Sequence, residues 1–196
     1  MTQFAELERE LAAPALDLDA ATRAAGEFLA ALGVSCDTES MERTPRRMAE
    51  AYAAMLTSLT FETTTFPNDE AYDELVVVRS IPVQSVCEHH FLPFTGVAHV
   101  GYLPGRRIVG LSKLARVVEM YARRPQVQER LTQQVADWVD LHLDPHGVGV
   151  VIEAEHACMT LRGVQVAGTT TSTSALRGVL RENPASRAEF LANVRS

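Results

Sequence analysis

Apolar residues recur at helical spacing in the first third of the chain. A first helix is predicted after Asp19, which can cap its start, and Gly33 is suited to end it. The apolar face of this helix comprises Ala21, Ala25, Phe28, Leu29 and Leu32. Thr44 and Pro45 predict a second helix, with the hydroxyl as cap and proline at the first helical position. Its apolar face comprises Met48, Tyr52, Met55 and Leu59.

A threonine-rich stretch without periodicity follows, and it predicts a linker over residues 60–68. Strands are then expected over residues 75–79, 81–86 and 95–102. Pro82 indicates a break or a sheet edge between the first two strands, because proline cannot donate to a sheet ladder. We therefore expect an N-terminal helical region in residues 1–70 and a separate domain in residues 71–196.

The remaining chain changes from strands to helices and back to strands. Two helices are predicted, one capped by Ser112 and ending at Arg124, and one after Pro125 with Trp138 on its apolar face. A strand is expected over residues 149–159, a pair of short strands over 163–174, and a last helix after Asn183. This order is typical of an α+β fold with an antiparallel sheet rather than of an alternating parallel α/β fold.

Composition and charge narrow the class of protein. The chain has 196 residues, of which 46% are hydrophobic and 22% charged, as in ordinary globular domains. Its formal net charge of −7 disfavours binding along a nucleic acid backbone, although a local basic pocket for a small anion remains compatible with it. Three distant cysteines, at 36, 87 and 158, form no disulfide framework. Without a signal peptide or an apolar span, a cytoplasmic protein is expected.

Two clusters of cysteine and histidine suggest a zinc site. Cys87 and His90 have the spacing of zinc ligands, and His89 lies between them. His156 and Cys158 follow much later, where alternation along a strand would point both the same way. Three ligands from Cys87, His90 and Cys158 would leave an open position, with two histidines nearby for proton transfer. The alternatives are a closed structural site with four of these five residues, or buried cysteines without a metal.

Basic and acidic residues form a second set of candidates. Ser112, Lys113 and Arg116 lie in the first turns of a predicted helix, whose free amides favour a phosphate. Arg162 follows the second metal cluster closely. Glu129, next to Gln128, could accept two parallel hydrogen bonds from a planar group such as guanine. The alternatives are a solvated charged face and a glutamate that stabilises a helix N-terminus.

These motifs, in this order, resemble the GTP cyclohydrolase I family. The resemblance rests on the segments Arg43–Met48, Cys87–Phe94, Gly110–Arg116, Arg124–Thr132, His156–Met159 and Arg162–Gly163. It implies hydrolysis and rearrangement of GTP to formate and 7,8-dihydroneopterin triphosphate, the first step of pterin and folate synthesis. It also implies a Zn²⁺ site of Cys87, His90 and Cys158, with His89 and His156 as acid–base residues. The implied substrate contacts are Ser112, Lys113, Arg116, Gln128, Glu129 and Arg162.

The family resemblance also implies a fold and an assembly. The fold is the tunnelling fold, an antiparallel four-stranded sheet with two helices, here preceded by a helical region. In this fold, sheets from several subunits close into a barrel, which removes exposed sheet edges. A ring-shaped homodecamer with active sites between subunits is therefore expected.

Three other functions compete with this interpretation. Zinc nucleobase deaminases need a His-x-Glu and a Pro-Cys-x-x-Cys motif, and the chain contains neither. A nitrile reductase with the same fold would use a nucleophilic cysteine and a nicotinamide, which leaves the paired zinc clusters unexplained. The non-enzymatic alternative is an inactive tunnelling-fold binding module that zinc stabilises.

Overall fold

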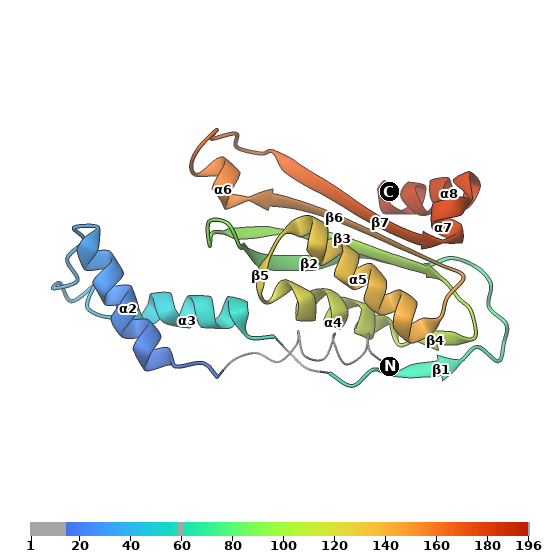
Figure 1. Cartoon of the computed structure of the whole chain (residues 1–196), viewed down its shortest axis with the longest axis horizontal. Coiled ribbons are helices and arrows are strands. Elements are labelled where there is room, and N and C mark those ends of the chain that lie inside the picture. Colours follow the sequence, from blue (N-terminus) through green and yellow to red (C-terminus); the bar gives the residue numbers. More distant parts are fainter. Residues whose placement is uncertain (1–14, 59–60, 196) are drawn as a thin grey trace. The chain divides into compact units, whose positions relative to one another are not determined.

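The computed structural model describes residues 15–58 and 61–195. The chain forms two compact units, the first ending at Ser58 and the second containing the remainder. Among the described residues, no helix combines the length and apolar character that crossing a membrane requires. The predicted α+β class is confirmed, with helices first and an antiparallel sheet after them (Figure 1).

The first unit contains helix α2 (Leu18–Ala31), which begins one residue before the predicted cap. Asp17 caps it instead, because its Oδ1 accepts a hydrogen bond of 2.9 Å from the backbone N–H of Ala20. Asp19, the predicted cap, lies inside the first turn and forms an ion pair with Arg46 of the second helix at 2.8 Å. The prediction of a helix was therefore right and that of its cap wrong.

Helix α3 (Thr44–Leu56) starts at the predicted position but without the predicted cap. Proline occupies the start of the helix, and Arg43 stands at the N-cap without a side-chain hydrogen bond. The Thr44 hydroxyl donates to the sulfur of Met41 at 3.6 Å instead of capping the helix. Proline's fixed φ angle is the signal that placed this helix correctly.

One sheet dominates the second unit. Its long strands are β2 (Val76–Cys87), β3 (Pro93–Leu103), β6 (Gly147–His156) and β7 (Thr170–Gly178). They pair antiparallel in the order β2-β3-β6-β7, and β5 (Pro125–Gln126) pairs parallel with the end of β2. The four long strands agree with the expected four-stranded antiparallel sheet. The sequence-based pair of short strands at 163–174 is corrected to the single strand β7.

The two strands predicted around Pro82 are one strand. β2 continues through a register shift between Val78 and Ile81, where Ser80 has a positive φ of 55°. Pro82 pairs with Val97 of β3, and its other side carries no neighbouring strand in the described sheet. Proline is tolerated there because a sheet edge does not need its missing N–H. Pro82 therefore marks an edge and not a break.

The predicted linker over residues 60–68 contains a short strand. β1 (Thr65–Pro67) pairs antiparallel with β4 (Arg107–Val109), so the linker prediction was wrong for these three residues. Arg107 strengthens the pairing, since its Nε donates to the Thr65 hydroxyl at 2.8 Å. Periodicity fails on a strand of three residues, because such a strand shows less than two full alternations.

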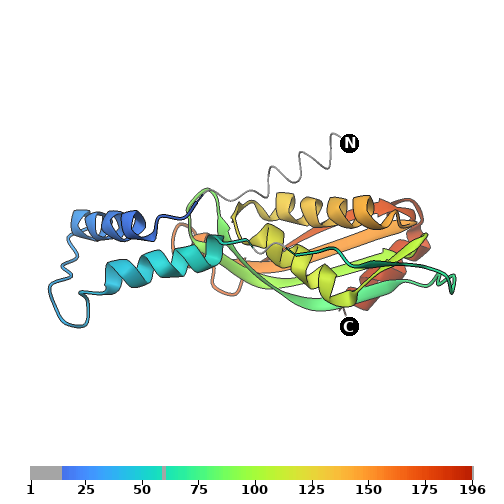
Figure 2. The same cartoon turned by 90° about the horizontal axis from the view of Figure 1, so that it is seen from below.

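Two helices, α4 (Leu111–Ala122) and α5 (Gln128–Leu143), cover one face of the sheet (Figures 1 and 2). Gly110 stands at the N-cap of α4 without a side-chain hydrogen bond, so Ser112 is not the cap that the sequence predicted. The buried residues of these helices include Leu114, Val117, Val118, Tyr121, Leu131, Val135, Trp138 and Val139. This core holds both helices, and with them the candidate substrate residues, against the strands.

The other face of the sheet carries the C-terminal helices α7 (Val179–Glu182) and α8 (Pro184–Arg195). Asn183 caps α8 as predicted, accepting from the N–H of Ala185 at 2.8 Å. Phe190 is fully buried, and its ring lies against Gly149. A Cβ atom at position 149 would stand only 2.6 Å from this ring. A glycine in β6 thus makes room for the aromatic ring.

Phe190→Ala is expected to lower the free energy of unfolding by roughly 3–5 kcal/mol, because it empties this closely packed position. Urea unfolding followed by tryptophan fluorescence measures the change. Phe66→Ala is the control, since Phe66 is 49% exposed and should cost far less. Equal effects of the two variants would contradict the packing described here.

Candidate active site

The first half of the cysteine and histidine cluster lies on a tight turn between β2 and β3. Cys87 is the last residue of β2, and its N–H donates to the carbonyl of Leu92 at 2.8 Å. Phe91 closes the turn by donating to the Cys87 carbonyl at 2.8 Å, with a positive φ of 55°. The turn brings Nδ1 of His89 and Nδ1 of His90 to 3.8 Å and 3.9 Å from the Cys87 sulfur.

The second half of the cluster is placed differently from the prediction. The strand expected over residues 149–159 ends at His156, and Cys158 lies in the short helix α6 (Ala157–Thr160). The strand alternation that pointed His156 and Cys158 the same way is therefore wrong. The change from strand to helix turns the Cys158 sulfur towards Cys87.

Three side chains converge on one possible metal position. The ligand atoms of Cys87, His90 and Cys158 all lie within 4.8 Å of one another, and they form the one such group found among the described residues. Tetrahedral ligands with bonds of about 2.3 Å would lie about 3.8 Å apart, so a small contraction suffices. Burial raises the pKa of the Cys158 thiol, the Cys87 sulfur adds to the rise, and Arg162 opposes it. A cation would relieve this conflict between two sulfurs.

His156 borders the cluster without joining it. Its ring stacks on Phe94 with centroids 4.5 Å apart and planes inclined by 14°. Its Nε2 lies 2.7 Å from Oε1 of Gln128. Burial lowers the pKa of His156, and the nearby charge of Glu129 partly counters this. The side chain is thus held in place, and burial makes its protonated form readier to give up a proton.

A pocket of about 220 Å³ opens beside the cluster. It is lined by Cys87, His89, His90, Gln126, Val127, Gln128, Glu129, His156, Cys158, Met159 and Thr171. The structure thus brings the metal candidates, both acid–base candidates and Glu129 together. Glu129 is exposed at the start of α5, where its carboxylate is free to meet a ligand, whereas Gln128 is only 2% exposed.

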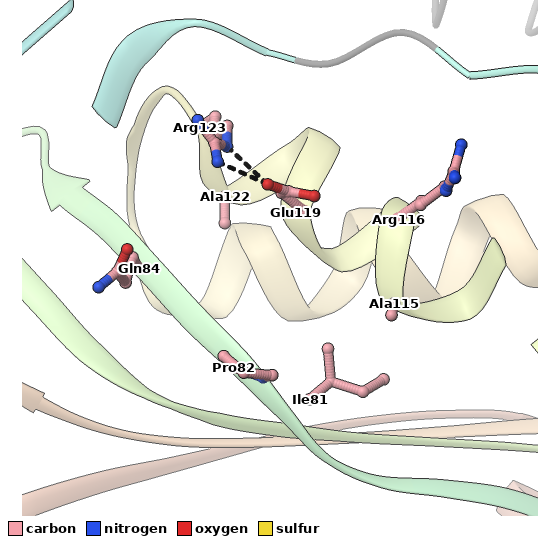
Figure 3. A pocket seen from close by; sticks show the side chains of 8 residues that line it. All are labelled: Ile81, Pro82, Gln84, Ala115, Arg116, Glu119, Ala122 and Arg123. Carbon is pink, nitrogen blue, oxygen red and sulfur yellow. Dashed lines mark hydrogen bonds and ion pairs between the residues drawn. The ribbon is translucent and has the colours of Figure 1, made fainter. Parts of the chain in front are cut away.

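The predicted phosphate contacts lie outside this pocket. Ser112 is exposed, and Nζ of Lys113 sits 5.8 Å from the centroid of the Phe61 ring. Arg116 lines a separate pocket of about 270 Å³ between α4 and β2, where Glu119 and Arg123 form an ion pair (Figure 3). These residues are therefore not gathered at the metal cluster within one chain. Arg162, also exposed, is close enough to lower the pKa of Cys158.

Strand geometry explains this separation. The start of α4 lies near the start of β2. The backbone N–H of Val109, just before α4, donates to the hydroxyl of Tyr102 at 3.3 Å, and Tyr102 pairs with Val76, the first residue of β2. Cys87 ends the same strand, eleven residues later, which is roughly 36 Å at about 3.3 Å per residue. The start of α4 and the metal cluster therefore occupy opposite ends of the sheet (Figure 1).

Sequence reasoning missed one contact that holds the ligand turn. Glu88 forms an ion pair with Arg130 of α5, and the hydrogen bond from Arg130 lowers the pKa of the Glu88 carboxyl. The Nε of Arg130 also donates to the buried Gln126 side chain at 3.0 Å. The position of Glu88 inside the Cys-Glu-His-His segment was the available signal. This contact braces the turn against the helix that carries Glu129.

Comparison with known proteins finds a matching family model and relatives of similar sequence. A family model described as GTP cyclohydrolase I matches residues 21–195. A protein named GTP cyclohydrolase 1 from Mycobacterium tuberculosis is 52% identical over 180 residues, covering 89% of each chain. One of the same name from Corynebacterium glutamicum is 47% identical over 194 residues, covering 96% of this chain and 99% of its own. The solved apo structure of archaeosine synthase QueF-Like has a TM-score of 0.45 and 19% identity, covering 53% of this chain and 93% of its own.

Proposed function

This chain belongs to the GTP cyclohydrolase I family, and we propose that it converts GTP and water to formate and 7,8-dihydroneopterin triphosphate. The chemistry takes place within residues 71–196. The observation that carries the proposal is the convergence of Cys87, His90 and Cys158 beside a pocket that also holds His156 and Glu129. A purely structural metal site has no need of such a pocket.

Zinc is the metal that we propose for the cluster. Two thiolates and one imidazole are ligands that zinc prefers, and three protein ligands are typical of a catalytic site with one open position. When bound there, zinc supplies Lewis acidity and lowers the pKa of a water to about 7. His89 lies outside the group of three, so it stays available as a base beside the ligands.

The side chains around the pocket divide the remaining work. The Glu129 carboxylate accepts two hydrogen bonds from guanine N1–H and N2–H, which orients the purine. In its protonated form His156 donates a proton to N7 as water adds at C8 and becomes the neutral ring, and the imidazole ring of the purine then opens. His89 takes part in the later proton transfers that release formate and precede closure of the pterin ring. Burial around His156 favours transfer of its proton to the substrate.

A second copy of the chain completes the site in this proposal. Ser112, Lys113 and Arg116 contact the ribose and triphosphate, with Arg162 near the metal. A nucleotide is much shorter than β2, which separates the start of α4 from the metal cluster. Ser112 and Lys113 therefore reach a nucleotide bound at the cluster only from another subunit. Within the described sheet, the outer edge of β7 is unpaired, as an edge that joins another sheet would be. A homodecamer is the proposed assembly, and its mass is measurable by light scattering.

Incubation of zinc-loaded protein with GTP tests the proposed function. Formate and a pterin that fluoresces after oxidation are the expected products. A zinc-stabilised binding module would bind the metal yet leave the ultraviolet spectrum of the purine unchanged, and that result would refute the enzymatic proposal. Chelated protein serves as the control and should lose the activity.

Glu129→Gln should weaken GTP binding by roughly 1.5–3 kcal/mol, because the amide loses the charge and one acceptor. The preference for GTP over ATP should narrow, while metal content stays unchanged. Calorimetric titration with both nucleotides measures the two effects. Glu182→Gln, which alters a carboxylate in α7, is the control. Unchanged discrimination in Glu129→Gln would mean that guanine is held elsewhere.

A further inference from the structure

The side chain of Gln128 is buried, and its orientation is determined by its neighbours. Its Nε2 lies 3.0 Å from the carbonyl oxygen of Ile152 and 2.9 Å from that of Thr171. A backbone carbonyl can only accept a hydrogen bond, so the group that faces these two oxygens is the NH₂. Rotating the amide by 180° would place its oxygen against both carbonyls. The amide oxygen therefore faces the opposite way, towards His156.

Two hydroxyl groups support the same orientation. The Thr132 hydroxyl donates its single proton to the backbone carbonyl oxygen of Gln128, one turn earlier in α5, at 2.8 Å. The Thr173 oxygen lies 2.7 Å from that of Thr132, so Thr173 is the donor in this contact. Its lone pairs then accept from Nε2 of Gln128 at 3.1 Å. Every donor in this buried network therefore has an acceptor.

The network determines which nitrogen of His156 carries a proton. Oε1 of Gln128 lies 2.7 Å from Nε2 of His156, and an amide oxygen only accepts. Nε2 must therefore be the N–H side of the ring. Within the described residues, Nδ1 of His156 has no protein hydrogen bond, and stacking on Phe94 holds the plane of the ring.

We infer that Gln128 is a positioning residue that holds His156 as the Nε2–H tautomer and leaves Nδ1 to exchange protons with the substrate. The inference deepens the proposed function and rests on it for the role of Nδ1. It also assigns Gln128 a role other than the substrate contact that the family resemblance implied. Its amide groups are already engaged by the protein, so its effect on GTP passes through the histidine.

The tautomer can be observed directly. We suggest ¹⁵N solid-state NMR of sedimented, zinc-loaded protein labelled with ¹⁵N-histidine, at a pH where the ring is neutral and without GTP. The difference from His156→Asn assigns the signals. A protonated Nε2 and an unprotonated Nδ1 are expected, and the reverse pattern would overturn the inference. Because no GTP is present, this result stands even if the protein fails to hydrolyse GTP.

Two variants separate positioning from substrate binding. Gln128→Met retains the size of the side chain but not its hydrogen bonds, so we expect a mixture of tautomers with unchanged zinc content. Turnover should fall, at most by the about 10²–10⁴-fold expected for a lost general acid, while the KM for GTP stays unchanged. Thr173→Val is the matched control, since two carbonyls still orient the amide and the Nε2–H signal should persist. A raised KM with unchanged kcat in Gln128→Met would overturn the inference. If Gln128→Met does not fold, the spectrum of the unaltered protein decides alone.

Discussion

Cys158→Ser is expected to lose nearly all bound zinc and nearly all turnover. The substitution leaves only Cys87 and His90, and two ligands do not complete a catalytic zinc site. Loss of a residue that merely supports a ligand already weakens metal binding about 10–100-fold, so loss of a ligand should exceed this. Metal analysis after gel filtration, together with the pterin fluorescence assay, measures both losses.

Cys36→Ser provides the control for this variant. Cys36 is a partly exposed free thiol in the first unit, and it belongs to no group of possible metal ligands among the described residues. Zinc content and turnover should therefore match those of the unaltered protein. Full zinc occupancy in Cys158→Ser would show that the ligand assignment is wrong.

His156→Ala should keep zinc, fold and bind GTP, but its turnover should fall by at least about 10²–10⁴-fold. The ring lies beside the cluster but outside the group of three ligand side chains, so the metal does not depend on it. The loss should appear at the first step, before ring opening, so neither formate nor a ring-opened formyl intermediate should accumulate. Single-turnover chromatography on zinc-loaded protein detects both species.

His142→Ala is a matched control for His156→Ala. His142 also stacks on an aromatic ring, that of Trp138 at 4.0 Å, and burial lowers its pKa as well. It lies in the last turn of α5, away from Glu129 at the start of the same helix, so turnover should be retained. Zinc loss in His156→Ala would favour a closed structural site, whereas ring opening at the normal rate would remove His156 from the chemistry.

The sequence by itself determined the α+β class, the family and the identity of the candidate metal ligands. Helix periodicity and proline at a helix start act within a few residues, so they predict the helices of this class. The family and the candidate ligands follow from short motifs that are read directly along the chain. The residues that cap the helices were harder to predict from the sequence. Asp19 was the predicted cap, but Asp17, a chemically identical side chain two residues earlier, accepts the capping hydrogen bond, and Asp19 pairs with Arg46 instead.

Only the tertiary structure decided how the candidate residues are divided in space. The chain changes from strand to helix after His156, and this change places Cys158 in the cluster. The alternation of side chains along a strand does not predict where a strand ends. The buried amide of Gln128 depends on carbonyl groups of β6 and β7, which are distant in sequence. The length of β2 separates the start of α4 from the metal cluster. Sequence motifs identify chemical groups, but distances between groups on different strands depend on how the sheet pairs and packs.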